Sequence, residues 1–101
     1  MKALQGGRGL LASVPVDRIV AVVTSAPDYE MSRLVYVEDW PEYDDHSVID
    51  GGHCSCYGFE DTEWTGTTYT RDELRVAATK WQEDGLELER EIAPAILRAL
   101  A

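Results

Sequence analysis

The first long apolar run of the chain covers residues 16–24, which are mostly β-branched and almost continuously hydrophobic. Such a run is typical of a strand that is buried on both faces, and it is short for a helix. We therefore expect a central strand here. A second apolar run lies within residues 31–40 and stops at Pro41. Turn-forming residues separate the two runs, so the pattern predicts a hairpin.

A shorter strand is expected at residues 47–50, and Gly51 and Gly52 follow it directly. Two consecutive glycines are compatible with a two-residue hairpin turn. They are also compatible with a bulge inside one longer strand that continues to Tyr57. The sequence leaves both interpretations open.

The sharpest local signal is a helix start at Thr70. Its hydroxyl can accept a hydrogen bond from a free amide of the first turn, while Glu73 reaches back to the backbone of Thr70, which is a capping box. Apolar residues then recur at helical spacing, and Gly85 offers a C-terminal stop. The residues of this apolar stripe are Leu74, Ala77, Ala78 and Trp81.

A second helix is predicted over residues 86–100, because apolar residues recur four apart on one face. These residues are Leu88, Ile92, Ile96 and Leu100. Pro94 must kink this helix or begin a separate turn, since proline lacks the amide that continues a helix. Strands followed by helices indicate an α+β fold. We expect an antiparallel sheet of three to four strands, with the two C-terminal helices packed on one face.

The length of 101 residues fits a single domain with one hydrophobic core. Residues 1–15 contain three glycines by position 9 and end in Pro15, so we expect a flexible N-terminal arm there. Residues 16–101 are then the single α+β domain.

The net charge of −10 comes from one third of the chain. Residues 28–63 hold eleven carboxylates against one base, Arg33, whereas the other eight acids are balanced by eight bases. The eleven are Asp28, Glu30, Glu38, Asp39, Glu42, Asp44, Asp45, Asp50, Glu60, Asp61 and Glu63. We expect them to form one acidic face. Such a face repels nucleic acid and anionic membranes and attracts basic protein surfaces.

Aromatic residues are interleaved with these acids, a combination found in protein interfaces. Tyr36 and Phe59 are expected in the core, whereas Trp40 and Tyr43 lie in a stretch that is too acidic to bury deeply. The predicted partner-binding residues are Glu38, Asp39, Trp40, Glu42, Tyr43, Asp44 and Asp45. The alternative is a solvated rim of acidic turns that blunts sheet edges and keeps the protein soluble.

Residues 52–58 form the one segment where metal-binding side chains are closely packed. Cys54 and Cys56 project from one face of a strand and can chelate a soft metal such as zinc. His46 or His53 would supply a third ligand, and Asp44 or Asp45 a further one. Zinc modules usually repeat paired ligands, however, and the chain has no other cysteine. Two small buried hydrophobes are therefore the favoured interpretation, with no cofactor.

An enzyme is not expected. The surrounding carboxylates raise the pKa of the thiols and suppress the thiolate, and phosphate-loop, catalytic-triad and zinc-protease motifs are missing from the sequence. No run approaches the roughly 20 apolar residues that span a membrane. The sequence predicts a soluble cytoplasmic protein with reduced cysteines.

The segment 52–60 also carries a resemblance, in the pattern G-x-C-S-C-x-G-F-E followed by Trp64 and the helix start at Thr70. Over about residues 34 to 80 the chain resembles short, largely uncharacterised proteins of bacteriophages and their bacterial hosts. The resemblance implies a phage accessory protein that acts in the host cytoplasm by binding a host machine. Acidic proteins of this kind, among the anti-restriction and anti-CRISPR inhibitors, occupy nucleic-acid-binding surfaces.

The hypothesis from the sequence is thus a non-enzymatic inhibitor whose acidic segment blocks the basic, nucleic-acid-binding surface of a host defence protein. Two alternatives stay open. One is a small zinc-binding module built on Cys54 and Cys56. The other is a structural phage protein that forms homo-oligomers through the apolar faces of its helices.

Overall fold

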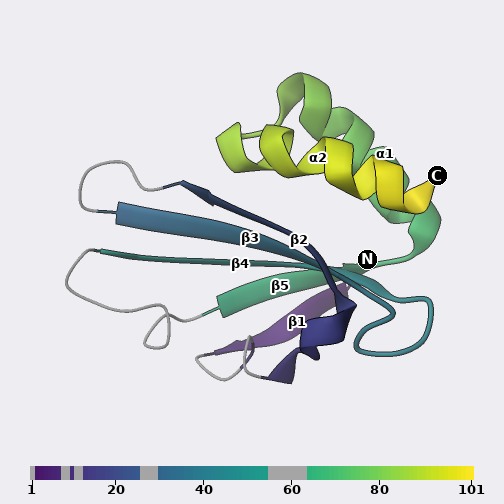
Figure 1. Cartoon of the computed structure of the whole chain (residues 1–101), viewed down its shortest axis with the longest axis horizontal. Helices are drawn as coiled ribbons and strands as arrows, with labels where there is room; N and C mark the ends of the chain where they lie inside the picture. Colours follow the sequence, from purple (N-terminus) through teal and green to yellow (C-terminus); the bar gives the residue numbers. More distant parts are fainter. Residues whose placement is uncertain (1, 8–9, 11–12, 26–29, 55–63) are drawn as a thin grey trace.

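The computed structural model describes residues 2–7, 10, 13–25, 30–54 and 64–101, with backbone only at residues 5–7, 25, 30, 31, 53 and 54. This part of the chain forms one antiparallel sheet of five strands, followed by two helices (Figure 1). The elements are β1 (Lys2–Gly7), the short 3-10 helix η2 (Val16–Arg18), β2 (Ile19–Ser25), β3 (Glu30–Glu38), β4 (His46–Cys54), β5 (Trp64–Tyr69), α1 (Arg71–Asp84) and α2 (Glu87–Leu100). The strand order is β1-β5-β4-β3-β2. The predicted α+β class is confirmed, with one strand more than expected.

The apolar run at residues 16–24 is an edge strand, and its prediction as a central strand was wrong. Within the described residues β2 pairs with β3 alone, and the run begins with the turn of η2. Val22 remains 49% exposed. The strands that are buried on both faces are β3 and β4, with four consecutive buried residues each, 34–37 and 46–49. Because α2 covers one face of β2, hydrophobic residues gather there without the strand being central.

The expected N-terminal arm contains β1, so that prediction was wrong for residues 2–7. β1 pairs with β5 from Lys2 opposite Thr68 to Gly7 opposite Trp64. Gly66 of β5 lets the Leu4 side chain of β1 lie close to the β5 backbone. A Cβ on Gly66 would lie 2.9 Å from the Leu4 side chain. The missing side chain on β5 therefore makes room for β1.

Gly51 and Gly52 lie inside a strand. They pair with Arg33 and Ser32 of β3, and β4 continues without a turn to Cys54. The hairpin interpretation is thereby excluded. β3 and β4 are joined instead by residues 39–45, after the last ladder pair, Glu38 and His46.

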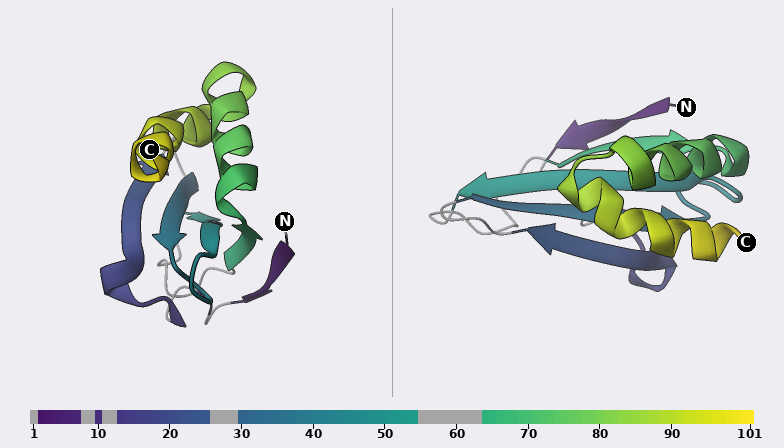
Figure 2. Two further views of the ribbon diagram at one scale, coloured as in Figure 1. Left: turned by 90° about the vertical axis from the view of Figure 1, so that its right-hand side faces the viewer. Right: turned by 90° about the horizontal axis from the view of Figure 1, so that it is seen from above.

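Both helices pack on one face of the sheet (Figure 2). The capping box at Thr70 and Glu73 is confirmed, because the side chain of each accepts from the backbone amide of the other. Gly85 ends α1 as expected. α2 continues through Pro94 as one helix. Proline has no amide hydrogen, so the carbonyl group of Arg90 loses its helical partner. Pro94 is exposed, so water can bond this carbonyl group instead. Neither helix of the described chain is long and apolar enough to cross a membrane.

The sheet carries a hydrophobic cluster on each face. The helix-side cluster consists of Leu34, Tyr36, Val48, Tyr69, Leu74, Ala78, Ile92, Ala93, Ile96 and Leu100. The predicted apolar faces of both helices therefore point into the core. The open-side cluster, on the face away from the helices, consists of Val14, Val35, Val37, Ile49 and Trp64. Partly buried Leu4, Leu10, Ile19 and Trp40 pack against it.

Candidate functional site

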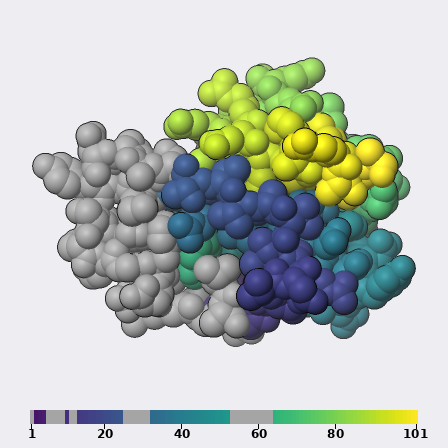
Figure 3. Space-filling view, in the orientation of Figure 1, coloured from purple at the N-terminus to yellow at the C-terminus, as the bar shows by residue number. Residues whose placement is uncertain are grey.

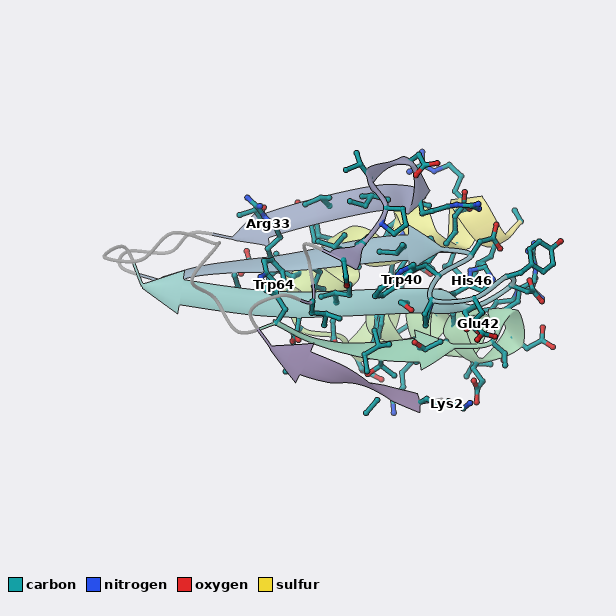
Figure 4. All side chains as sticks on the ribbon, turned by 90° about the horizontal axis from the view of Figure 1, so that it is seen from below. Lys2, Arg33, Trp40, Glu42, His46 and Trp64 are labelled. Atoms are coloured by element: carbon teal, nitrogen blue, oxygen red, sulfur yellow. The ribbon has the colours of Figure 1, made fainter. Side chains whose placement is uncertain are left out.

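The predicted partner-binding residues lie in the turn between β3 and β4, which we name the acidic turn (residues 38–45). Figure 4 shows Trp40, Glu42 and His46 at this end of the sheet, near Lys2, whereas Arg33 lies toward the other end. Because β4 begins and β5 ends here, the start of α1 lies at the same end. A cleft of about 430 Å³ lies beside the turn, lined in part by Lys2, Pro41, Glu42, Asp45 and Glu73.

Hydrogen bonds within the acidic turn fix its backbone. The amide of Trp40 donates to the carbonyl of Asp45 at 3.2 Å, and the amide of Asp45 to the carbonyl of Glu42 at 3.1 Å. The Asp45 carboxylate accepts from the Glu42 amide at 3.3 Å, and the Asp39 carboxylate accepts from the Asp44 amide at 3.0 Å. Two of the candidate carboxylates, Asp39 and Asp45, thus hold the turn itself.

Two residues of the turn have a positive φ, Asp39 at 52° and Asp44 at 66°. Aspartate tolerates this left-handed region better than most residues, because its short polar side chain can bond the nearby backbone. The Trp40–Pro41 peptide is cis. The aspartates are therefore also a conformational requirement of the turn, which the composition of the segment did not indicate.

Three contacts attach the turn to the rest of the molecule. Arg18 Nη1 lies 3.3 Å from Asp39 Oδ2, forming a partly exposed ion pair. The Ser47 hydroxyl donates to the carbonyl of Trp40 at 2.7 Å. The Trp40 ring is half-buried against the open-side cluster. Trp40 thus anchors the turn, and its expected role as an interface residue stays a prediction.

The side chains that project from the turn are Glu42, Tyr43 and Asp44, which we name the tip. Tyr43 is 88% exposed, and the carboxylates on either side of it are exposed as well. A large aromatic ring is thus displayed between two negative charges, on a backbone that its neighbours hold in place.

His46 belongs to the core beneath the tip. It is 5% exposed, and its Nδ1 lies 3.0 Å from the hydroxyl of Tyr36. Its Nε2 has no hydrogen-bond partner among the described residues and lies 3.8 Å from Asp44 Oδ1. Burial, followed by the nearby charge of Glu38, raises the pKa of Tyr36 to about 12. The Tyr36 hydroxyl is therefore held in its neutral form.

The predicted metal set is divided by the fold. His46 begins β4, whereas His53 and Cys54 end it, and the seven residue steps from His46 to His53 span roughly 24 Å of strand. The expectation that His46, Asp44 or Asp45 would complete a site with Cys54 was therefore wrong. In the described part of the chain, no three metal-ligating residues lie together. The side chains of His53 and Cys54 and the whole of Cys56 lie outside the described residues, so a site there stays a prediction.

We had expected the acidic segment to form a single face. Its described residues do not do so. Its residues 38–45 lie at one end of the sheet, and the backbone of Glu30 lies at the other end of β3. Asp50 lies between these ends on β4. Antiparallel strands carry the segment along the sheet and back, so neighbours in sequence separate in space. Asp28, Phe59, Glu60, Asp61 and Glu63 lie outside the described residues.

Comparison with known proteins gives no match, since no family model, curated protein or solved structure is significantly similar to the chain. The resemblance carried by residues 52–60 remains a prediction. Function is therefore argued from the geometry of the acidic turn.

Proposed function

We propose that the protein is a non-enzymatic binding protein whose tip docks on a basic, nucleic-acid-binding surface of another protein and occludes it. The observation that carries the proposal is Tyr43, displayed at 88% exposure between the outward carboxylates of Glu42 and Asp44. Tyrosine is enriched among the residues that dominate binding energy, because its rigid ring buries a large area at low entropic cost.

The preformed backbone of the turn supports the proposal. The carboxylates of Asp39 and Asp45 accept hydrogen bonds from backbone amides of the turn and hold it in the free protein, so less conformational entropy is lost on binding than for a flexible loop. The carboxylates of Glu42 and Asp44 can accept paired hydrogen bonds from arginine, a residue typical of nucleic-acid-binding surfaces. The net charge of −10 adds long-range attraction to such a surface and repels nucleic acid itself.

The biological setting follows from the resemblance at residues 52–60. It makes the partner a defence protein of a bacterial host, and the protein a phage inhibitor of the anti-CRISPR or anti-restriction kind. The tip then mimics the negative charge of the nucleic acid that the partner normally binds.

The first test replaces the tip by Glu42→Gln, Tyr43→Ala and Asp44→Gln together. The control is Glu83→Gln with Asp84→Gln, which removes the same two charges from the exposed end of α1. Each tagged protein is used to capture partners from host lysate at low and at high salt, and affinity for the purified partner is then measured. We expect the tip variant to bind at least ~10-fold more weakly, about 1.4 kcal/mol, and the control to bind as the wild type does.

Binding of the wild type should also fall with added salt, because exposed charges are screened. Equal affinity of tip and control variants would contradict a role for the tip. A partner that is not basic, or binding that is insensitive to salt, would contradict the electrostatic part of the proposal.

We infer self-association as a second candidate function, favoured by the outer edge of β2. The apolar helix residues pack in the helix-side cluster, so we place the self-association at the sheet edge instead. The strand Ile19–Ser25 has no charge and no proline, and Val16, Val20 and Val22 are exposed at this edge. Figure 3 shows this part of the chain on the surface below α2. An unprotected edge strand can pair with a second copy across a two-fold axis.

Val22→Lys is predicted to abolish such a dimer, because lysine on an edge strand opposes pairing. The control is Val76→Lys on α1, which adds the same charge at another exposed valine. Sedimentation at increasing protein concentration should give a dimer for the wild type and the control and a monomer for Val22→Lys. The dimer should strengthen with salt, because screening weakens the repulsion between two acidic chains. A monomeric wild type at all concentrations would exclude this function.

A further inference from the structure

A second cleft lies on the helix side of the sheet, away from the acidic turn. Its volume is about 260 Å³, and its floor is formed by Leu34 and Val48 of the helix-side cluster. The polar and aromatic residues that line it are Asp50, Thr65, Thr67, Tyr69, Trp81 and Glu89. They come from β4, β5 and both helices, so the packing of the helices on the sheet forms the cleft.

Two aromatic rings meet at a right angle in the lining. The rings of Tyr69 on β5 and Trp81 on α1 have centroids 6.4 Å apart and an interplanar angle of 83°. The face of an aromatic ring carries partial negative charge and attracts a cation, tryptophan most strongly. Because the two rings are perpendicular and line one cleft, a cation bound there can contact both of them.

Two carboxylates complete the lining. Asp50 accepts a hydrogen bond from the Thr65 hydroxyl, and one oxygen of Glu89 accepts from the Leu86 amide at 2.9 Å. Neither forms an ion pair within the described chain, and no lysine or arginine is among the described residues that line the cleft. Each carboxylate therefore has an oxygen that can bind a positively charged ligand.

We propose that this cleft binds an organic ammonium ion. The positive group lies against Tyr69 and Trp81 and between the carboxylates of Asp50 and Glu89, while the attached carbon chain lies on Leu34 and Val48. An anion is excluded by the two negative charges. A bare metal ion does not suit the site, because no three metal-ligating side chains gather in the described part of the chain and one wall is aromatic.

The test compares choline with 3,3-dimethylbutan-1-ol, which has the same shape and no charge. Each is titrated into the full-length protein while the indole N–H signals are followed by NMR, with the Trp81 signal assigned through Trp81→Phe. We expect a saturable shift of the Trp81 signal with choline, and binding at least ~10-fold tighter than that of the neutral compound. No saturable shift, or equal binding of the two compounds, would overturn the proposal.

Glu89→Gln tests the charge without removing the helix cap, because the glutamine oxygen can still accept from the Leu86 amide. This variant should weaken choline binding at least ~3-fold and leave the neutral compound unaffected. Glu83→Gln, an exposed carboxylate of α1 outside the cleft, is the control and should bind as the wild type does. Equal loss in both variants would assign the effect to net charge and contradict a built site.

A titration with N-acetyl-lysine methylamide distinguishes the two sources of an ammonium group. Binding tighter than that of choline would identify the ligand as a lysine side chain of another protein. A preference for choline would identify a free quaternary ammonium compound. Both results require the rings and the carboxylates of the same cleft.

Discussion

Replacing Trp64 by alanine is expected to destabilise the protein by about 3 to 5 kcal/mol, the usual cost of truncating a fully buried aromatic residue. Trp64 is 1% exposed on β5 and packs in the open-side cluster with Val35, Val37 and Ile49. The helices α1 and α2 pack on the opposite face. The described residues that can fill the gap are therefore those of the cluster and the partly buried residues that pack against it. The cost includes both the lost hydrophobic burial and the cavity that remains.

The measurement is urea unfolding followed by far-UV circular dichroism, with Trp40→Ala as the matched control. Trp40 packs against the same cluster but is only half-buried, so its truncation should cost less than half as much. Because a domain of this size is stable by about 5 to 15 kcal/mol, Trp64→Leu provides a milder variant that still folds. If Trp64→Ala costs no more than Trp40→Ala, the open-side cluster does not contribute a second core.

The two helices were predictable because their signals are local. Thr70 and Glu73 specify the start of α1 within four residues, and Ile92 and Ile96 place the apolar face of α2 at a spacing that only a helix brings together. The strands β2, β3 and β4 were predicted as strands, whereas β5 was not predicted and β1 was assigned to the flexible arm. The places of the strands in the sheet were not predictable either. Whether Ile19–Ser25 is central or at the edge depends on which other segments pair with it, and the apolar run contains no such information.

The N-terminal strand shows the same limit. Its glycines are typical of a mobile arm, and β1 forms because Gly66 and Thr68, far along the chain, offer a free strand edge with room for Leu4. This pairing is non-local, so no pattern within the first fifteen residues indicates it.

For the candidate site, the sequence predicted the location of the turn but not the roles within it. Seven residues were named; Glu38 ends β3 opposite His46, and the fold assigns the other six different tasks. Asp39 and Asp45 bond the backbone, Trp40 anchors the turn, and Glu42, Tyr43 and Asp44 project. These roles depend on the backbone path, which residue types alone do not specify. The cleft that we propose binds an ammonium ion was missed because its lining comes from five separate elements.

The second large effect is expected at alkaline pH, where Tyr36 should make the protein lose up to about 3 kcal/mol of stability. Burial raises the pKa of Tyr36 from the ordinary value of 10.0 to about 12 in the folded state. The unfolded chain therefore releases this proton near pH 10, while the folded chain holds it until about pH 12. The contribution is fully present below pH 10 and is lost as the pH rises to about 12, at about 1.4 kcal/mol for each pKa unit.

Tyr36→Phe isolates this contribution when its free energy of unfolding is compared with that of the wild type from pH 8 to about pH 12. At pH 8 the variant should be about 1 kcal/mol less stable, since the hydroxyl loses its contact with His46. Above pH 10 the variant lacks the ionisable group, so its stability should fall less steeply, and the two curves should converge or cross. Tyr69, whose pKa is also raised by burial, leaves a residual slope in both proteins.

The control is Tyr43→Phe, which removes a hydroxyl at the exposed tip and should keep the pH dependence of the wild type. A constant difference between wild type and Tyr36→Phe at every pH would contradict the raised pKa. Because Tyr36 contacts His46, whose Nε2 faces Asp44 at 3.8 Å, ionisation of Tyr36 places a negative charge next to the ring that supports the tip.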